Sequence, residues 1–221
     1  MDGNDGLVSA RHDGGQTPAV AVTDEAVAGI RLGKAVVLPT DTVYGLCVDA
    51  YREEPARRLV RLKQRPETMP IALLAADLDA VLDAVPELRG RAAVVARALL
   101  PGPYTLVLPN PARRFRWLAG TTPEAIGIRV PELPEPARAV LERVGVVAAT
   151  SANLHGSSDP ARVEDIPAEI RENVYAVVDA GPLPGTPSTV VDLTGSEPQV
   201  LREGAVAADE ARARIARVAA E

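Results

Sequence analysis

The stretch KAVVLPTDTVYGLCVDA, residues 34–50, decides what fold the rest of the chain can adopt. Residues 35–38 form a short apolar run ended by Pro39, which is typical of a buried strand, and residues 43–48 indicate a second strand. Between the two strands lie Thr40, Asp41 and Thr42. Hydroxyl and carboxylate groups at the end of a sheet are typical of a ligand site. A turn capped by its own side chains explains the same residues, so both interpretations stay open.

Composition limits the class of protein. With 221 residues, 47% of them hydrophobic and 24% charged, the chain fits one soluble domain, and no apolar run approaches the roughly 20 residues of a membrane helix. The chain has one cysteine, Cys47, and two histidines, which excludes an internal disulfide and leaves too few ligands for a zinc site. A cytoplasmic location is expected. The net charge of −6 argues against a surface that binds nucleic acid throughout, but it allows a local basic cleft.

The first residues differ from the remainder of the chain. Residues 1–18 are rich in Gly and Asp and contain no apolar segment of the kind found in secretory signals. We therefore expect a disordered tail over residues 1–18 and a single domain over residues 19–221.

Strands and helices are expected to alternate along residues 19–221. Thr23 is a plausible N-cap of a first helix that Gly33 stops, and Pro55 can start a second helix. Asp77 is expected to cap a third helix, and two more helices are expected at residues 91–100 and 208–218. Further strands are expected at residues 70–75, 105–108, 125–130, 146–150, 175–178, 190–192 and 200–201. This alternation predicts an α/β fold, a three-layer single domain with a twisted mixed sheet of parallel and antiparallel strands.

Polar side chains follow two of these elements where each ends. Lys63 continues the apolar stripe of the second helix and Arg65 follows it, so the pair can point into a cleft, although a lysine that snorkels to the surface explains the pattern too. Ser151 and Asn153 follow the strand at residues 146–150, at the sheet edge where α/β proteins bind ligands. A polar turn is the alternative there.

Several kinds of chemistry are excluded by the motifs that the chain lacks. No Walker loop and no Gly-x-Gly-x-x-Gly occur, so any nucleotide must be bound in another way. A hydrolase built on Ser151 and His155 is disfavoured, because Ser151 lies in no Gly-x-Ser-x-Gly elbow and no orienting acid is evident. The groups that remain are the cations Lys63, Arg65, Arg129 and Arg202, the hydroxyls of Thr40, Thr42, Ser151 and Ser188, and the amide of Asn153.

Seven short motifs occur in an order that resembles one known family. They are PTDTVYGL (39–46), KQRP (63–66), PGPYTLVL (101–108), GIRVP (127–131), TSAN (150–153), STVVD (188–192) and LREG (201–204). Together they resemble the YrdC-like threonylcarbamoyl-AMP synthases, over about residues 23–206. The resemblance implies an enzyme that converts L-threonine, bicarbonate or CO2, and ATP into threonylcarbamoyl-adenylate and pyrophosphate. This is the first step in forming N6-threonylcarbamoyladenosine at position 37 of tRNA.

The resemblance also implies roles for individual residues. Lys63 and Arg65 would be the catalytic cations. The residues that would hold ATP are Lys63, Arg65, Ser151, Asn153 and Arg202, and those that would hold threonine are Thr40, Tyr44, Arg129 and Ser188. Mg2+ would be carried by the triphosphate of ATP, with no metal ligand from protein side chains. These roles suit the side chains, since arginine binds carboxylate and phosphate in a bidentate manner and lysine acts as a point charge.

Some positions depart from the family pattern. Met69 stands where members often carry Lys or Asn, His155 replaces a frequent serine, and Asp159, Pro160 and Ala161 stand where a Ser-Pro-Thr is common. These departures concern the contacts to ATP. The length of the chain resembles the short, single-domain bacterial form.

Two alternative functions fit part of the pattern. Related domains use carbamoyl phosphate in carbamoyl transfer, usually beside further domains. The other alternative is a module that binds tRNA or double-stranded RNA without catalysing a reaction. Such a module would recognise the shape of the RNA and not stack on its bases, because the chain has few aromatic residues. For the synthase, the expected small-molecule partners are ATP, L-threonine and bicarbonate. The expected macromolecular partners are tRNA and the proteins that transfer the threonylcarbamoyl group to it, and no membrane association is expected.

Overall fold

A computed structural model describes residues 19–219, so the tail expected at residues 1–18 lies outside the described residues. The strands are β1 (Val36–Leu38), β2 (Gly45–Asp49), β3 (Ala72–Leu74), β4 (Tyr104–Pro109), β5 (Ala125–Arg129), β6 (Val147–Ser151), β7 (Ala176–Val177), β8 (Thr189–Asp192) and β9 (Gln199–Arg202). The helices are α1 (Ala19–Arg31), α2 (Glu53–Leu62), α3 (Leu78–Ala84), α4 (Gly90–Leu99), α5 (Glu135–Val144), α6 (Ala168–Arg171) and α7 (Ala208–Ala219), with 3₁₀ turns η1 (Arg116–Leu118) and η2 (Val163–Asp165). Within the described part of the chain, no helix is both long and apolar enough to span a bilayer.

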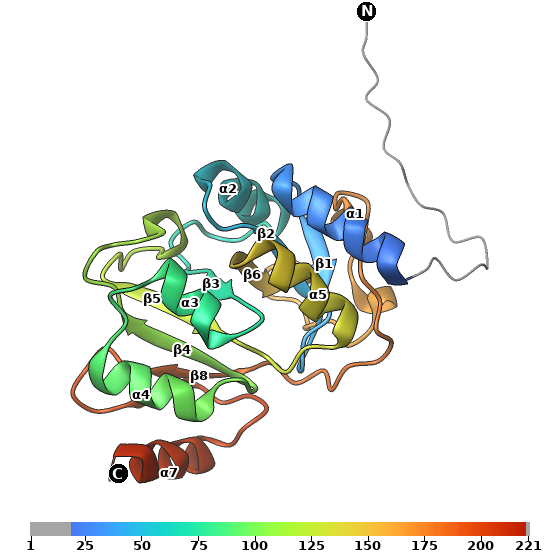
Figure 1. Ribbon diagram of the computed structural model, residues 1–221. Helices are drawn as coiled ribbons and strands as arrows, with labels where there is room; N and C mark the ends of the chain where they lie inside the picture. Colours follow the sequence, from blue (N-terminus) through green and yellow to red (C-terminus); the bar gives the residue numbers. More distant parts are fainter. Residues whose placement is uncertain (1–18, 220–221) are drawn as a thin grey trace, which may run out of the picture.

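All nine strands form one mixed sheet in the order β7-β1-β2-β6-β3-β5-β4-β8-β9 (Figure 1). The pairs β1/β7, β3/β5 and β4/β8 are parallel, and the other neighbours are antiparallel. The mixed sheet predicted from the sequence is therefore confirmed.

Helices cover both faces of the sheet, which gives the three expected layers. Because side chains alternate along a strand, Leu46 packs in a core with α2, α3, α4 and α7, whereas its neighbour Cys47 faces a second core with α1 and α5. The second core takes its strand residues from β1, β2, β3, β6 and β7. On the same face, the alternate residues of β4, β5 and β8, among them Thr105, Gly127 and Val190, line a cavity instead. The half of this face that α1 and α5 do not cover is thus where a ligand can bind.

The predicted caps had different outcomes. Asp77 caps α3 as expected, since its Oδ1 accepts a hydrogen bond of 2.8 Å from the backbone N–H of Ala80. Thr23 is not an N-cap, because α1 already includes Ala19 and the Ala and Val residues before Thr23 continue the helix. Instead, Thr23 lies inside α1 with its side chain buried.

Candidate active site

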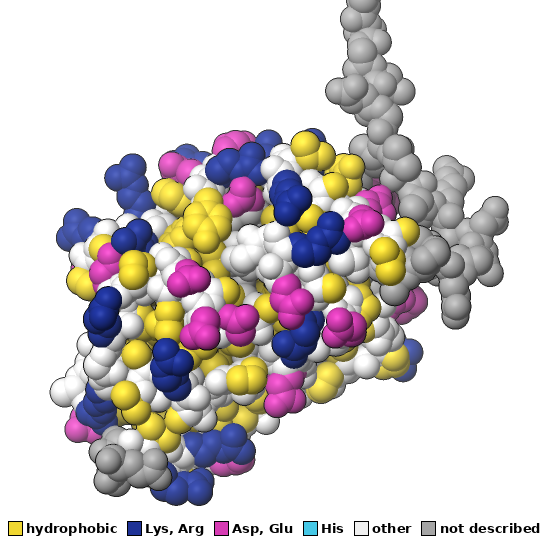
Figure 2. All heavy atoms as spheres, viewed as in Figure 1, with side chains coloured by type: hydrophobic (Ala, Val, Ile, Leu, Met, Phe, Trp, Pro, Cys, Tyr) yellow, Lys and Arg dark blue, Asp and Glu magenta, His cyan; other side chains and the backbone are white. Residues whose placement is uncertain are grey.

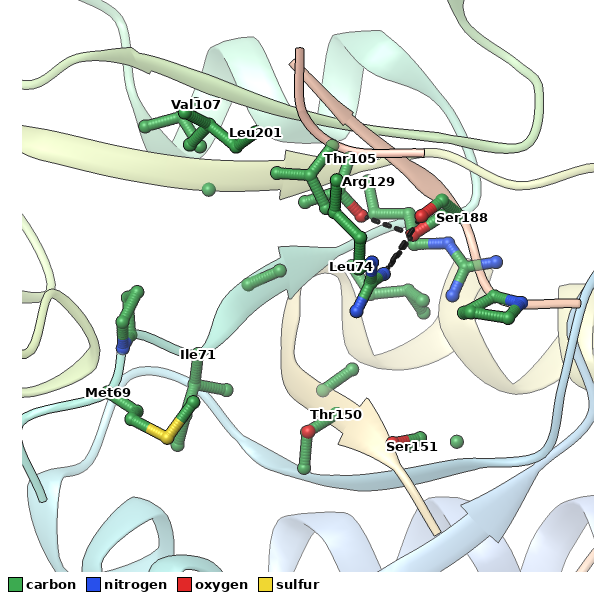
Figure 3. A pocket seen from close by; sticks show the side chains of 18 of the residues that line it. Met69, Ile71, Leu74, Thr105, Val107, Arg129, Thr150, Ser151, Ser188 and Leu201 are labelled. Atoms are coloured by element: carbon green, nitrogen blue, oxygen red, sulfur yellow. Dashed lines mark hydrogen bonds between the residues drawn. The ribbon is translucent and has the colours of Figure 1, made fainter. Parts of the chain in front are cut away.

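The cavity has a volume of about 510 Å3 and lies across the carboxyl ends and faces of several strands (Figure 3). Its polar lining includes Thr40, Arg65, Arg129, Ser151, Ser188 and Arg202, which come from six of the seven motifs. Met69, Ile71, Val107 and Leu201 contribute apolar lining. The cavity therefore combines a cationic, hydroxyl-rich part with an apolar part.

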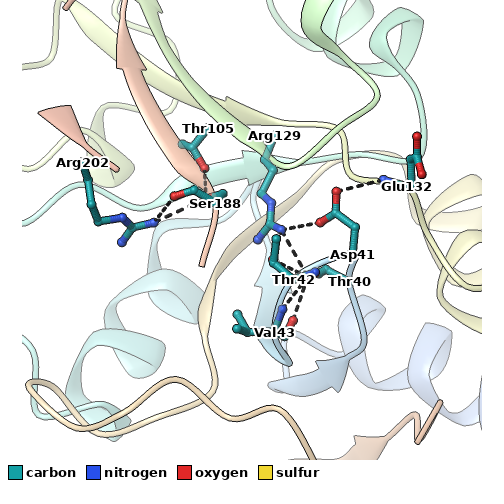
Figure 4. A network of polar contacts seen from close by, with 9 residues as sticks. All are labelled: Thr40, Asp41, Thr42, Val43, Thr105, Arg129, Glu132, Ser188 and Arg202. Carbon is teal, nitrogen blue, oxygen red and sulfur yellow. Dashed lines mark hydrogen bonds and ion pairs between the residues drawn. The ribbon is translucent and has the colours of Figure 1, made fainter. Parts of the chain in front are cut away.

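Arg129, the last residue of β5, is fixed by the turn between β1 and β2 (Figure 4). Its Nη2 forms an ion pair of 2.7 Å with Asp41 Oδ1 and contacts the hydroxyls of Thr40 and Thr42. The side chains of Arg129 and Asp41 are only 12% and 11% exposed. Burial lowers the pKa of Arg129 and the Asp41 carboxylate opposes that shift. The Nε of Arg129 is buried and has no hydrogen-bond partner among residues 19–219.

Thr40 shapes this turn. Its hydroxyl donates to the carbonyl of Val43 at 2.7 Å and accepts from the N–H groups of Thr42 and Val43. The capped turn that the sequence left open is therefore present, and the turn also presents Arg129 to the cavity. The two interpretations of residues 40–42 describe the same structure.

Ser188 and Arg202 form a second polar group at the start of β8 and the end of β9 (Figure 4). Arg202 Nη2 donates to the backbone carbonyl of Ser188 at 2.8 Å, and the hydroxyls of Ser188 and Thr105 lie 2.8 Å apart. The close approach depends on Gly204, since a Cβ there would overlap the carbonyl of Pro187. Position 204, the last of the LREG motif, therefore requires a glycine.

Arg65 leads from α2 to the cavity. Its Nη1 donates to the hydroxyl of Thr150 at 3.0 Å and its Nη2 to the carbonyl of Pro70 at 2.7 Å. Burial lowers the pKa of Arg65, and repulsion from Arg202 lowers it further. Two arginines that repel each other in a cavity favour an anionic ligand, because the anion would stabilise both charges.

Lys63 is buried, at 2% exposure, which excludes the alternative of a lysine that snorkels to the surface. Its ammonium donates to the carbonyls of Ser151 and Asn153 and to the side-chain oxygen of Asn153, the last two at 2.7 and 2.8 Å. Burial lowers the pKa of Lys63 to about 8, with repulsion from Arg65 as the second cause. Lys63 therefore fixes the TSAN segment and does not line the cavity itself.

Asn153 and Tyr44 also lie behind the cavity wall. Asn153 accepts from the hydroxyl of Ser151 at 2.6 Å and donates to the carbonyl of Ser157 at 2.6 Å, which orders the segment after β6. The hydroxyl of Tyr44 accepts from the N–H of Ala180 and lies within hydrogen-bond distance of Asp179. Burial raises the pKa of Tyr44.

Of the residues expected in a site, the structure brings six into the cavity and leaves three just behind it: Lys63, Asn153 and Tyr44. Thr105, Thr150 and Asp159 also line the cavity and were not in the expected set. Thr105 and Thr150 lie inside quoted motifs, so membership of those motifs was the available signal. Asp159 carried a signal only as a departure from the family pattern. Among residues 19–219, no group of three or more His, Cys, Asp or Glu side chains could hold a metal ion.

Fold and site together define a class of α/β protein with an arginine-lined cavity on a half-covered sheet. The sequence model of the Sua5, YciO and YrdC family, which bears the description "Telomere recombination", matches residues 28–204. The chain therefore belongs to the Sua5/YciO/YrdC family.

Relatives of known name are found in bacteria and archaea. A Mycobacterium tuberculosis protein, named provisionally as a threonylcarbamoyl-AMP synthase, is 35% identical over 194 residues, 87% of each chain. Escherichia coli YciO, which is named as uncharacterized, is 32% identical over 192 residues, 85% of this chain and 91% of that protein. The structure of Pyrococcus abyssi Sua5 complexed with L-threonine matches with a TM-score of 0.81 at 30% identity, over 91% of this chain. This chain spans 59% of the archaeal one.

Proposed function

We propose that this protein is a threonylcarbamoyl-AMP synthase, an enzyme that forms threonylcarbamoyl-adenylate and pyrophosphate from L-threonine, bicarbonate or CO2, and ATP. The observation that carries the proposal is one cavity in which Arg65, Arg129 and Arg202 meet, with Arg202 lowering the pKa of both other arginines. A carboxylate and a triphosphate are the anions that such a set of cations suits. The likeness to a threonine-complexed Sua5 supports threonine as one ligand.

Threonine would bind beside the turn between β1 and β2. Arg129 lines the cavity there, and Ser188 offers a hydroxyl that is already oriented by Thr105. The amino acid carboxylate would accept from Arg129. Thr40 and Tyr44 would act mainly through the backbone they fix, since their hydroxyls are engaged within the protein.

ATP would bind with its phosphates at Arg65, Ser151 and Arg202 and its base in the apolar part of the cavity. Lys63 and Asn153 would support the phosphates by holding the TSAN segment in place and by adding positive charge behind it. The triphosphate would in turn reduce the repulsion between Arg65 and Arg202.

The reaction needs positioning and charge stabilisation rather than a protein nucleophile. The threonine nitrogen forms a bond to the carbon of CO2 and loses a proton, which gives a carbamate. A carbamate oxygen then attacks the α-phosphorus of ATP, the bond from that phosphorus to the bridging oxygen breaks, and pyrophosphate leaves. Arg65 and Arg202 would stabilise the negative charge that gathers on the phosphates. Mg2+ bound to ATP would supply further neutralisation.

Pyrophosphate release tests the proposal. The purified chain is given ATP and Mg2+, with and without bicarbonate, and with L-threonine or L-serine. We expect release that requires bicarbonate and L-threonine and that falls at least a hundredfold in Arg65→Ala and Lys63→Ala. Release independent of threonine, or consumption of carbamoyl phosphate instead, would contradict the proposal.

Transfer of the product to adenosine 37 of tRNA, by separate transfer proteins in the cytoplasm, completes the proposed role. Acidic and basic side chains are interspersed on the face of the protein in Figure 2, so direct RNA binding on this face would rest on scattered cations. Any such binding should weaken steeply between about 50 and 200 mM salt. Filter binding of tRNA to Arg65→Ala, which retains the surface but lacks the proposed activity, tests it.

A further inference from the structure

Asp159 is an acidic residue in a cavity whose other charges favour anions. Its side chain lines the cavity and forms no hydrogen bond or ion pair with any residue in the range 19–219. The backbone at this point is fixed, because the carbonyl of Pro160 accepts from the N–H of Tyr44 at 3.0 Å. The carboxylate is thus held at the cavity wall without a partner.

The other acidic side chains near the cavity are already engaged. Asp192, the last residue of β8, also lines the cavity, and its Oδ1 accepts hydrogen bonds of 2.8 and 2.6 Å from the N–H and hydroxyl of Thr194. Asp41 is paired with Arg129. Asp159 differs from both in that neither of its carboxylate oxygens is engaged by another described residue.

Asp159 lies on the side of the cavity where the phosphates of ATP would bind. The N–H of Tyr44 donates to the carbonyl of Pro160, and the carbonyl of Tyr44 accepts from the N–H of Ala152, so Asp159 lies beside the segment that carries Ser151. The Asp159 carboxylate also opposes the lowering of the pKa of Lys63, which holds that segment. A carboxylate so placed would repel a triphosphate unless a cation lies between them. Mg2+ is bound in proteins by one or two carboxylates together with substrate phosphates, and it keeps several waters.

We propose that Asp159 is a ligand, directly or through one water, of the Mg2+ ion that ATP carries into this cavity. The donor set fits this ion, since a single carboxylate cannot hold Mg2+ alone but can complete a shell of phosphate oxygens and water. The proposal rests on the proposed function, in that ATP is the nucleotide bound.

Calorimetric titration of ATP into the full-length protein, with excess Mg2+ and separately with EDTA, tests the proposal without relying on activity. With Mg2+, we expect Asp159→Asn to bind ATP about tenfold more weakly than the wild type. With EDTA, we expect the same variant to bind ATP as tightly as the wild type or more tightly, because a repelling charge is gone. The substitution should therefore weaken ATP binding only when Mg2+ is present.

Asp192→Asn is the matched control, an acidic residue of the same cavity with its oxygen engaged by Thr194. Its ratio of affinities with and without Mg2+ should equal that of the wild type. Tighter or unchanged ATP binding by Asp159→Asn in both conditions would overturn the role of Asp159 but leave the proposed function standing. Equal weakening of ATP binding in both conditions would have the same consequence. A wild type that binds no ATP in either condition would overturn the proposed function as well.

Discussion

At the residue scale, the position of Arg129 depends on Asp41. The pair is almost buried, and Asp41 also accepts from the N–H of Glu132, so its carboxylate joins the turn after β1 to the segment after β5. Removing the charge of Asp41 would leave a buried guanidinium uncompensated, which is strongly destabilising.

We expect Asp41→Asn to lower the free energy of unfolding by about 3 kcal/mol and to weaken threonine binding. Chemical denaturation and calorimetry measure the two effects. Asp24→Asn is the control, because the ion pair of Asp24 with Arg143 is on the surface and should contribute less than about 1 kcal/mol. Equal effects of the two substitutions would show that Asp41 does not position Arg129.

Lys63 should make ATP binding depend on pH. Its lowered pKa of about 8 means that the free protein loses the ammonium charge as the pH rises through that value. ATP affinity should therefore fall between pH 7 and 9, since both a positive charge and one of the hydrogen bonds to the TSAN segment are lost. Lys63→Met should bind ATP weakly at both pH values, and an equal pH dependence in this variant would contradict the assignment.

The arginines of the site could be predicted from the motifs, because each lies at the end of a short recognisable strand or helix or just after it. The contacts of Lys63 and Tyr44 could not, since their partners lie 90 and more than 130 residues away and depend on the sheet order. The sequence therefore indicated which residues gather, but not which of them line the cavity and which support it from behind.

At the scale of elements, one glycine joins two loops beside the cavity. Gly120 has a φ of +58°, and a Cβ there would overlap the carbonyl of Thr68. That contact holds the segment after η1 against residues 68–70, and both Met69 and Ala119 line the cavity. Only glycine fits this approach.

Gly120→Ala should destabilise the protein by more than Gly90→Ala, which has a similar φ of +64° but no atom within 4 Å of the added Cβ. The backbone conformation alone costs about 1–2 kcal/mol, so Gly90→Ala should lose that amount and Gly120→Ala more. Thermal denaturation compares the two. Equal losses would mean that the contact with Thr68 does not constrain the loops.

The sequence analysis predicts neither the short helix α6 nor the longer helix α5. It begins just after Pro134, has a proline in its first turn, and buries Ala137, Val140 and Leu141 against α1. The prolines that precede it are typical of a loop, and they mask the helical spacing of the apolar residues that follow. The strands, by contrast, were predicted within a few residues, because short β-branched runs between turns are distinctive.

At the scale of the whole molecule, the cavity forms because the sheet is covered unequally. Its lining comes from residues as far apart in the chain as Thr40 and Arg202, on strands from both halves of the sheet. A ligand bound there would link these segments. The sequence predicted the three layers, but which half of a face stays open depends on the strand order, which no local pattern contains.

Ligands should therefore stabilise the whole fold. At a hundredfold excess over the dissociation constant, a ligand adds about 2.7 kcal/mol, which corresponds to roughly 5–10 °C in the midpoint of unfolding. We expect L-threonine with MgATP to raise this midpoint more than either ligand alone. In Arg129→Lys, the increase caused by L-threonine should be lost. Unfolding midpoints that do not change with either ligand would place the site elsewhere.

The formation of the adenylate is the most direct measurement. The protein is incubated with ATP, Mg2+, L-threonine and 13C-bicarbonate, and the products are analysed by mass spectrometry. We predict a species that contains AMP, threonine and one 13C atom, formed only when all three substrates are present and absent with Arg65→Ala. Conversion of ATP to ADP or AMP without this labelled adduct would contradict the proposed function.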